Sequence, residues 1–165
     1  MRPLYFLAAA AILAVDQLTK WMVLTRLSAT ASVTVIPGML DLVLSQNRGI
    51  AFGMLGGVSS GAAFALIVLV SAAALTVVSW LLWRGGLGSR YGAAALVMIL
   101  GGAAGNFLDR VVRGSVVDFL DFYFRSYHWY TFNVADSAIV VGAGLLMIEL
   151  FRRPVREQET GNREQ

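Results

Sequence analysis

Three aspartates lie close together in the sequence, two within VVDFLDFYF and one at the end of FNVAD, and they could act on one bond. They are Asp118, Asp121 and Asp136, and neither Asp118 nor Asp136 has a basic residue three or four positions away that could neutralise it on a helix. Two carboxylates held together beside apolar material cannot both ionise cheaply, so they would share a proton. The ionised member can then take a proton from a water as it attacks a carbonyl, while the protonated member hydrogen-bonds the carbonyl oxygen. Such a pair can hydrolyse an amide.

The choice of two acids from the three depends on the backbone. If VVDFLDFYF is extended, as its Val, Phe and Tyr content favours, Asp118 and Asp121 point to opposite faces and only one can meet Asp136. Asp121 shares its face with Tyr123 and is interpreted as an ordinary solvated acid. Asp118 shares its face with apolar residues, an unusual environment for an acid: Val116, Leu120, Phe122 and Phe124. The predicted pair is Asp118 and Asp136, although Asp136 could instead cap the start of a helix.

Other ionisable residues interrupt apolar runs, where one charge at the bilayer centre costs about 2.5 to 3.5 kcal/mol. Asp16 and Lys20 are four residues apart with the acid first, which predicts a structural ion pair on a helix. A second polar group recurs at three- and four-residue steps, so that it lies on one helical face: Asn106, Asp109, Arg110 and Arg113. Either Asp109 and Arg113 pair at an interfacial helix end, or this face orients other carboxylates. The sequence leaves both interpretations open.

The composition narrows the classes of protein and of site. Of the 165 residues, 58% are hydrophobic and 14% charged, which indicates the bilayer as solvent. The net charge is +3, but the basic residues form no dense run, so no nucleic-acid partner is expected. With no cysteine and one histidine, thiolate chemistry and the usual zinc spacings are excluded, and we expect neither a metal nor a cofactor.

Four segments are long and apolar enough to cross a hydrocarbon core of about 30 Å: 4–24, 62–83, 91–108 and 134–151. A cleavable signal peptide at the N-terminus is disfavoured because three further spans follow. Gly101 and Gly105 have the four-residue spacing that lets helices approach closely. The predicted fold class is an all-α integral membrane protein with four transmembrane helices.

The distribution of arginine and lysine predicts the orientation. Their density is highest in the N-terminus, the loop 84–90 and the tail, which places both termini in the cytoplasm and the aspartates on the outer side. Residues 1–151 are expected to form a single membrane-embedded domain. The charged segment 152–165 is predicted to be a disordered cytoplasmic tail.

The outer segments are predicted to be structured. SVTVI, Pro37-Gly38 and MLDLVLSQ predict a β-hairpin, hence a small extracytoplasmic sheet lying on the membrane. Aromatic residues between 119 and 132 are expected to hold their segment at the headgroup level, and His128 is given no role. The segment NRGIAFGMLGG is either a linker or a loop whose backbone approaches a ligand.

Five blocks in this order and spacing resemble the signature motifs of the lipoprotein signal peptidase family, also called signal peptidase II. They are Asp16-x-x-x-Lys20, Asn47-Arg-Gly-Ile-Ala-Phe52, Gly105-Asn-Phe-Leu-Asp-Arg110, Val117-Asp-Phe119 and Phe132-Asn-Val-Ala-Asp136. The match extends from about residue 4 to residue 151. It implies a membrane aspartyl endopeptidase that cuts bacterial prolipoproteins immediately before their diacylglyceryl-modified cysteine, on the outer face of the cytoplasmic (inner) membrane.

The resemblance also implies roles for individual residues. Asp118 and Asp136 would be the catalytic pair, and Asp16 and Lys20 would either be structural or orient the residues of the site. Six further residues would bind the substrate or support the acids: Asn47, Gly49, Asn106, Asp109, Arg110 and Asn133. The hairpin and the 48–57 loop would form a cradle and a flap over the lipid.

The partners implied are the lipid-modified prolipoprotein and membrane lipids, with inhibition by the cyclic peptide globomycin, and the protein is expected to be a monomer. A proton- or ion-coupled transporter is the alternative, because it too would use intramembrane Asp and Lys. Its acids would lie near the midplane on repeated or broken helices, and no repeat is detected. A nonenzymatic membrane assembly subunit is the third option.

Overall fold

The structure is a computed structural model that describes residues 2–49 and 60–152. This part of the chain forms four long helices and one small sheet. The helices are α1 (Arg2–Arg26), α2 (Ser60–Trp83), α3 (Arg90–Arg113) and α4 (Val134–Arg152). By length and composition, all four could cross a membrane. The prediction of four helices long and apolar enough to span a membrane, together with a small sheet, is therefore confirmed.

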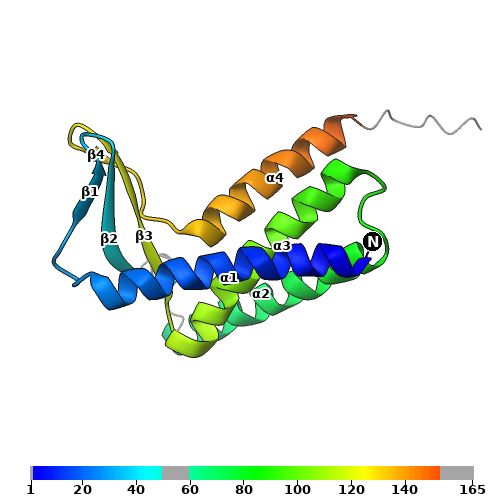
Figure 1. Cartoon of the computed structure of the whole chain (residues 1–165). Coiled ribbons are helices and arrows are strands. Elements are labelled where there is room, and N and C mark those ends of the chain that lie inside the picture. Colours follow the sequence, from blue (N-terminus) through cyan, green and yellow to red (C-terminus); the bar gives the residue numbers. More distant parts are fainter. Residues whose placement is uncertain (1, 50–59, 153–165) are drawn as a thin grey trace, which may run out of the picture.

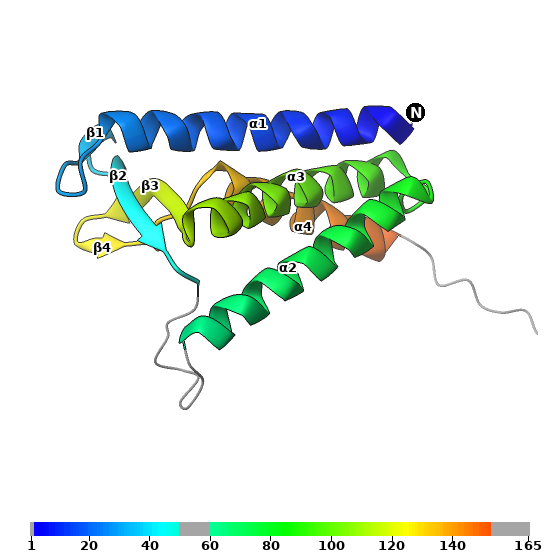
Figure 2. The ribbon, with the colours of Figure 1, turned by 90° about the horizontal axis from the view of Figure 1, so that it is seen from below.

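The sheet stands at one end of the helices, where α1 ends and α4 begins (Figure 1). The N-terminal end of α1 and the C-terminal end of α4 lie at the opposite end, as Figures 1 and 2 both show. The predicted loop 48–57 lies largely outside the described residues, which resume at Ser60, and the predicted tail lies outside them after Arg152.

Helix α3 lies at the centre of the bundle and packs against the other three helices. Its serine N-cap, Ser89, accepts a hydrogen bond from the Gly92 amide (2.9 Å), and Gly114 ends it in the left-handed conformation at φ 72°. The helix continues one turn beyond the predicted end at residue 108. The hydropathy of this last turn is low, but its charged side chains have partners in the fold, so the backbone remains helical.

Glycines let the helices approach α3 closely, as the spacing of Gly101 and Gly105 predicts. A Cβ on Gly101 would come within 2.8 Å of the Ala9 carbonyl oxygen of α1. On the α4 side, a Cβ on Gly102 would collide with the Ala135 carbonyl oxygen. These contacts bring the start of α4, and with it Asp136, against the middle of α3.

Replacing Gly102 by alanine is expected to lower the free energy of unfolding by about 1 to 3 kcal/mol, because the added methyl group meets backbone that cannot move without shifting α4. Gly144→Ala in α4 is the matched control, since its Cβ has nothing within 4 Å and alanine favours a helix. Thermal unfolding in detergent compares the two variants. Equal stability would contradict the tight packing of α3 on α4.

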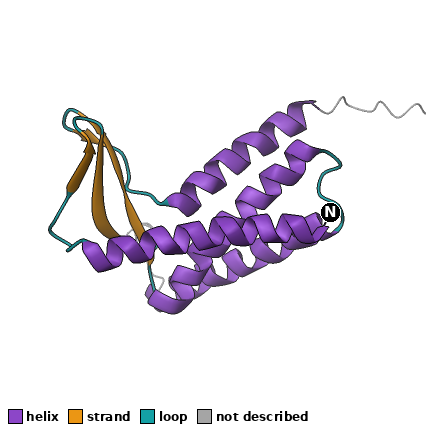
Figure 3. Cartoon of the chain, viewed as in Figure 1, coloured by secondary structure: helices purple, strands orange, loops and turns teal. Residues whose placement is uncertain are grey.

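The sheet is antiparallel, with order β1-β2-β3-β4, and its strands are shown in orange in Figure 3. Its strands are β1 (Val33–Ile36), β2 (Leu40–Asn47), β3 (Val116–Phe124) and β4 (Tyr127–His128). The predicted hairpin is present as β1 and β2, with Gly38 at φ 79° in its turn. The extended conformation predicted for VVDFLDFYF is also present, as β3.

The chain between β4 and α4 returns to β3 before the helix begins. The amide of Phe132 donates to the Leu120 carbonyl oxygen (3.1 Å), and the Phe132 carbonyl oxygen accepts from the amides of Phe119 and Leu120 (3.0 and 2.8 Å). The first residues of α4 therefore lie beside the start of β3, which is where Asp118 lies.

Candidate active site

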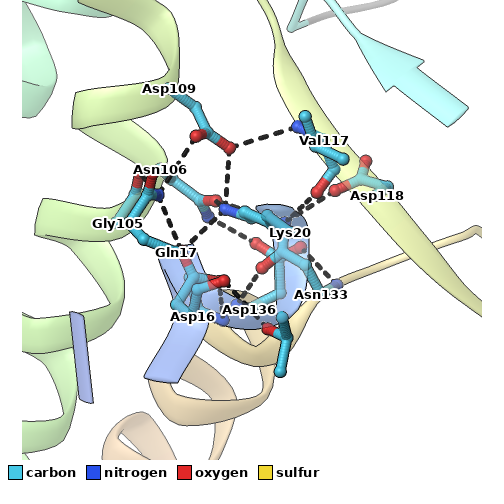
Figure 4. A network of polar contacts seen from close by, with 12 residues as sticks. Asp16, Gln17, Lys20, Gly105, Asn106, Asp109, Val117, Asp118, Asn133 and Asp136 are labelled. Atoms are coloured by element: carbon cyan, nitrogen blue, oxygen red, sulfur yellow. Dashed lines mark hydrogen bonds and ion pairs between the residues drawn. The ribbon is translucent and has the colours of Figure 1, made fainter. Parts of the chain in front are cut away.

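Asp118 and Asp136 are brought together by one residue, Asn133, which lies directly before α4. The Asn133 Nδ2 donates to Asp118 Oδ1 (2.7 Å), while its backbone amide donates to Asp136 Oδ2 (3.3 Å). Figure 4 shows both acids in one cluster of polar side chains, with residues from α1, α3, β3 and α4. The structure thus places together the two acids that the sequence selects.

Asp136 also takes part in the cap of its helix, so its interpretation as a capping residue is confirmed, and the cap does not prevent contact with Asp118 through Asn133. The Asp136 amide donates to Asn133 Oδ1 (2.9 Å), and Asp136 Oδ2 accepts from the Asn133 amide, in a reciprocal arrangement like a capping box. The other oxygen, Oδ1, accepts from Asn106 Nδ2 of α3 (2.7 Å). The cap fixes the direction of the carboxylate relative to Asp118.

Asp118 lies in a buried environment and is only 1% exposed. Burial raises the pKa of Asp118 to about 6; a hydrogen bond from Asn47 acts in the opposite direction, and the Asp136 carboxylate adds to the rise. A group with this pKa can hold or release a proton near neutral pH. The pKa of Asp118 is raised because this residue lies in the buried part of β3, beside a second carboxylate.

The raised pKa of Asp118 predicts that Asp118→Asn stabilises the protein at neutral pH, because an ionised buried carboxylate is removed. In the folded state the pKa of this acid lies above its ordinary value of 3.8, so the folded protein binds the proton more tightly than the unfolded chain does. The stability of the wild-type protein therefore falls as the pH rises from about 4 to 6. We expect a gain of about 1 to 2 kcal/mol at pH 7 that vanishes below about pH 4.

Thermal unfolding of the two proteins in detergent across this pH range measures the difference. A gain that is the same at pH 4 and pH 7, or a loss at pH 7, would contradict a buried acid with a raised pKa. Asp121→Asn is the comparison, because it removes a contact to His128 and should give no such gain.

Lys20 lies at the centre of the polar cluster and is fully buried. Its Nζ lies 2.9 Å from Asp16 Oδ2 and 2.8 Å from Asp109 Oδ2, and it donates to Asn106 Oδ1 (3.1 Å). The ion pair predicted for Asp16 and Lys20 is present, and Asp109 completes a triad. An ammonium only donates, so it holds the oxygen of the Asn106 amide and leaves the NH₂ group to face Asp136.

The two acids paired with Lys20 each hold the backbone next to one member of the candidate pair. Asp16 Oδ1 accepts from the amide of Ala135 (2.9 Å), the residue before Asp136. Asp109 Oδ2 accepts from the amide of Val117 (3.2 Å), the residue before Asp118. The buried triad therefore fixes the position of both carboxylates through the main chain.

Both interpretations of the polar face on α3 hold in part. Asp109 pairs with Arg113, as in an interfacial helix end, and it also orients the strand that carries Asp118. A residue that was not predicted to take part is Gln17, whose Nε2 donates to Asp109 Oδ1 (3.1 Å) and whose Oε1 accepts from Arg113 Nη1 (3.1 Å). The role of Gln17 could have been inferred from its position, because it is a further polar residue between Asp16 and Lys20 within an apolar run.

Arg110 and the end of β2 border the cluster. Arg110 Nη1 donates to the Asn106 carbonyl oxygen (3.1 Å), while its Nε is buried with no hydrogen-bond partner among the described residues. Gly49 has φ 76° and donates its amide to Asn47 Oδ1 (2.8 Å). A Cβ on Gly49 would lie 3.0 Å from Ile67 of α2 and 3.9 Å from the Arg110 guanidinium. Only glycine fits here without strain.

The prediction that Asp121 is a solvated acid is wrong. Asp121 is 9% exposed, and its Oδ2 lies 2.9 Å from His128 Nδ1, while the Tyr123 ring stacks on the His128 ring at 5.1 Å. The reason is the short hairpin of β3 and β4, which folds His128 back over β3 and gives Asp121 a partner that helical spacing could not reveal. Asp121 takes no part in the contacts that join Asp118 to Asp136.

Within residues 2–49 and 60–152, no three His, Asp or Glu side chains are grouped so that they could hold a metal ion. The cluster can instead do acid–base chemistry. It holds one carboxylate of raised pKa beside another, each with its own amide donor, and it has a buried guanidinium NH available to a peptide oxygen.

The chain matches known proteins over nearly its whole length. The family model for signal peptidase (SPase) II matches residues 8–152. A lipoprotein signal peptidase of Solibacter usitatus (strain Ellin6076) is 49% identical over 144 residues, covering 87% of this chain and 88% of that protein. A lipoprotein signal peptidase of Syntrophotalea carbinolica is 40% identical over 152 residues, covering 92% of this chain and 93% of that protein.

Two solved structures have the same fold. A bacterial membrane enzyme determined by the in meso method at 2.3 Å is 28% identical, with a TM-score of 0.79 over 96% of this chain and 94% of that one. Another, at 1.9 Å, is 29% identical, with a TM-score of 0.81 over 92% and 95%. Because the chain matches these proteins in sequence and fold over almost its entire length, it belongs to the signal peptidase II family of membrane-embedded aspartic peptidases.

Proposed function

We propose that this peptidase removes the signal peptide from diacylglyceryl-modified prolipoproteins, and that Asp118 and Asp136 activate the water that cuts the bond before the lipidated cysteine. The observation that carries this proposal is the joint placement of the two acids. Asn133 contacts both acids, and the Asn106 side chain donates to Oδ1 of Asp136. Burial raises the pKa of Asp118 to about 6.

The unequal environments of the two acids suggest their roles. Asp118 is almost fully buried and has the raised pKa, so it is the acid that takes up the shared proton when the substrate binds, and it then hydrogen-bonds the scissile carbonyl oxygen. Asp136 is ionised and takes a proton from the water, whose oxygen forms a bond to the carbonyl carbon. Asp136 then passes this proton to the departing amide nitrogen as the C–N bond breaks. A bound substrate excludes water, which further disfavours a second charge on the pair.

The residues around the pair are suited to hold an extended peptide. The buried Nε of Arg110 has no partner in the described part of the chain and can donate to a substrate carbonyl oxygen. Asn47 donates to Asp118 and lies next to Gly49, whose missing side chain leaves room between α2 and Arg110. These contacts support the roles in substrate binding that the family motifs imply.

The arrangement of the helices supports an extracytoplasmic site in the bacterial inner membrane. The sheet, which includes β3 with Asp118, and the start of α4, which carries Asp136, lie at one end of the helices, while the N-terminus and the end of α4 lie at the other. Arginine and lysine are densest at those termini, which favours the cytoplasm for that end. We propose that the sheet is a cradle on the outer surface, that the protein acts as a monomer, and that globomycin inhibits it. A transporter is not favoured, because the acids gather at one end beside a strand and the family is a peptidase family.

Cleavage of a synthetic precursor peptide by the purified protein in detergent tests this function. The substrate carries a diacylglyceryl cysteine, and mass spectrometry maps the bond that is cut. We expect cleavage immediately before the modified cysteine, the same rate with a chelator, and little cleavage of the matching unlipidated peptide. Cleavage at another bond, or loss of activity on chelation, would argue against the proposal.

A further inference from the structure

An apolar cavity of about 420 Å³ lies against the start of α4, and Asp136 forms part of its wall. One side is the segment 129–132 and the other is the first two turns of the helix. The lining residues are Trp129, Tyr130, Thr131, Phe132, Asp136, Ser137, Val140 and Val141. Because its one charged lining residue is a member of the acid pair, an occupant of this cavity would lie next to the reacting bond.

The loop side of the cavity is fixed to the strand that carries Asp118. The Trp129 amide donates to the Phe122 carbonyl oxygen (2.7 Å), and the Phe132 amide donates to the Leu120 carbonyl oxygen (3.1 Å). The rings of Phe122 and Phe132 stack with centroids 5.7 Å apart. These contacts set the distance between this wall and the acid pair.

The helix side of the cavity is exposed on the surface of α4. Val140 and Val141 are 69% and 52% exposed, on a helix that is long and apolar enough to span a bilayer. Trp129 and Tyr130 at the rim are 60% and 89% exposed, and such aromatic residues favour the membrane–water interface. An apolar chain can therefore enter from the bilayer, whereas a soluble peptide would have to cross this rim.

We propose that this cavity holds an acyl chain of the diacylglyceryl group on the substrate cysteine, an inference that rests on the proposed function. The modified cysteine directly follows the scissile bond, so its lipid must leave the site within a few atoms of Asp136. Bilayer lipid is as apolar as the cavity, so binding the chain here adds little free energy by itself. The cavity acts by fixing where the chain lies, which places the scissile carbonyl between the acids. It also gives a role to the aromatic segment 124–131, which the family motifs do not cover.

Filling the cavity tests the proposal. Val140→Trp puts a large ring into the space for the chain, and we expect kcat/KM for the lipidated peptide to fall about 10- to 100-fold. Val77→Trp is the matched control, since Val77 is 55% exposed on α2 and lines no cavity described here. Thermal unfolding shows that both variants are folded. Equal kcat/KM in the two variants would overturn the acyl-chain site while leaving the proposed function intact.

Photo-crosslinking gives a second test that needs no substitution in the cavity. The Asp118→Asn protein is mixed with a lipidated peptide whose acyl chain carries a diazirine, and labelled peptides are identified by mass spectrometry. We expect labels within residues 129–141. Labels confined to the apolar groove between α1 and the sheet, lined by Met22, Arg26, Val33 and Leu42, would overturn the assignment. Failure of the wild-type protein to cleave the same peptide would instead refute the proposed function.

Discussion

Asp118→Asn and Asp136→Asn are each expected to lower kcat for cleavage of a lipidated precursor at least about a thousandfold, because each variant removes one of the two groups that must exchange protons. Both variants should fold. Asparagine keeps the oxygen that accepts from Asn133 in one case and from Asn106 in the other. Initial rates in detergent, with thermal unfolding of the same samples, measure both properties.

Asp121→Asn provides the matched control within the same strand. It is expected to retain much of the activity, because Asp121 contacts His128 and not the acid pair. Full activity in Asp136→Asn would refute the assignment of the pair. Loss of activity in Asp121→Asn with an intact fold would place a third acid in the mechanism.

Lys20→Met is expected to lower the free energy of unfolding by about 3 to 5 kcal/mol, a loss large enough to prevent folding. The substitution leaves Asp16 and Asp109 fully buried without their shared cation. These acids also hold the backbone before Asp136 and before Asp118, so activity should be lost together with stability. Expression level, elution as a single species and thermal unfolding in detergent measure the effect.

A triple variant separates the charge of Lys20 from its role in orienting Asn106. Lys20→Met combined with Asp16→Asn and Asp109→Asn removes the uncompensated charges, so stability should largely return. Activity should remain low, because no ammonium holds the oxygen of the Asn106 amide away from Asp136. Normal stability in the single Lys20→Met variant would contradict a buried ion triad.

The sequence predicted the elements well because hydropathy and alternation report directly on burial. The apolar runs predict four helices, the dipeptide Pro37-Gly38 predicts the hairpin, and the spacing of Gly101 and Gly105 predicts close packing on α1. The Asp16–Lys20 pair is also local, four residues apart on one helix. Such features depend on neighbours in the chain and need no knowledge of the tertiary fold.

Contacts between distant elements could not be predicted in this way. The partner of Asp121 is His128 across a two-residue strand, and Gln17 reaches Asp109 from another helix. The end of α3 was placed five residues early because charges lower hydropathy, whether or not they have partners. The link between Asp118 and Asp136 through Asn133 depends on the return of the chain at Phe132 to β3, which no short pattern specifies.

Intact-protein mass spectrometry of a single turnover distinguishes direct attack of water between Asp118 and Asp136 from catalysis through a covalent enzyme intermediate. Excess enzyme is mixed with the lipidated precursor, quenched at intervals and weighed while the released signal peptide is quantified. The mechanism predicts that product forms with no change in the mass of the enzyme at any time. A transient adduct of enzyme and signal peptide, appearing before the product, would contradict water activation by the acid pair.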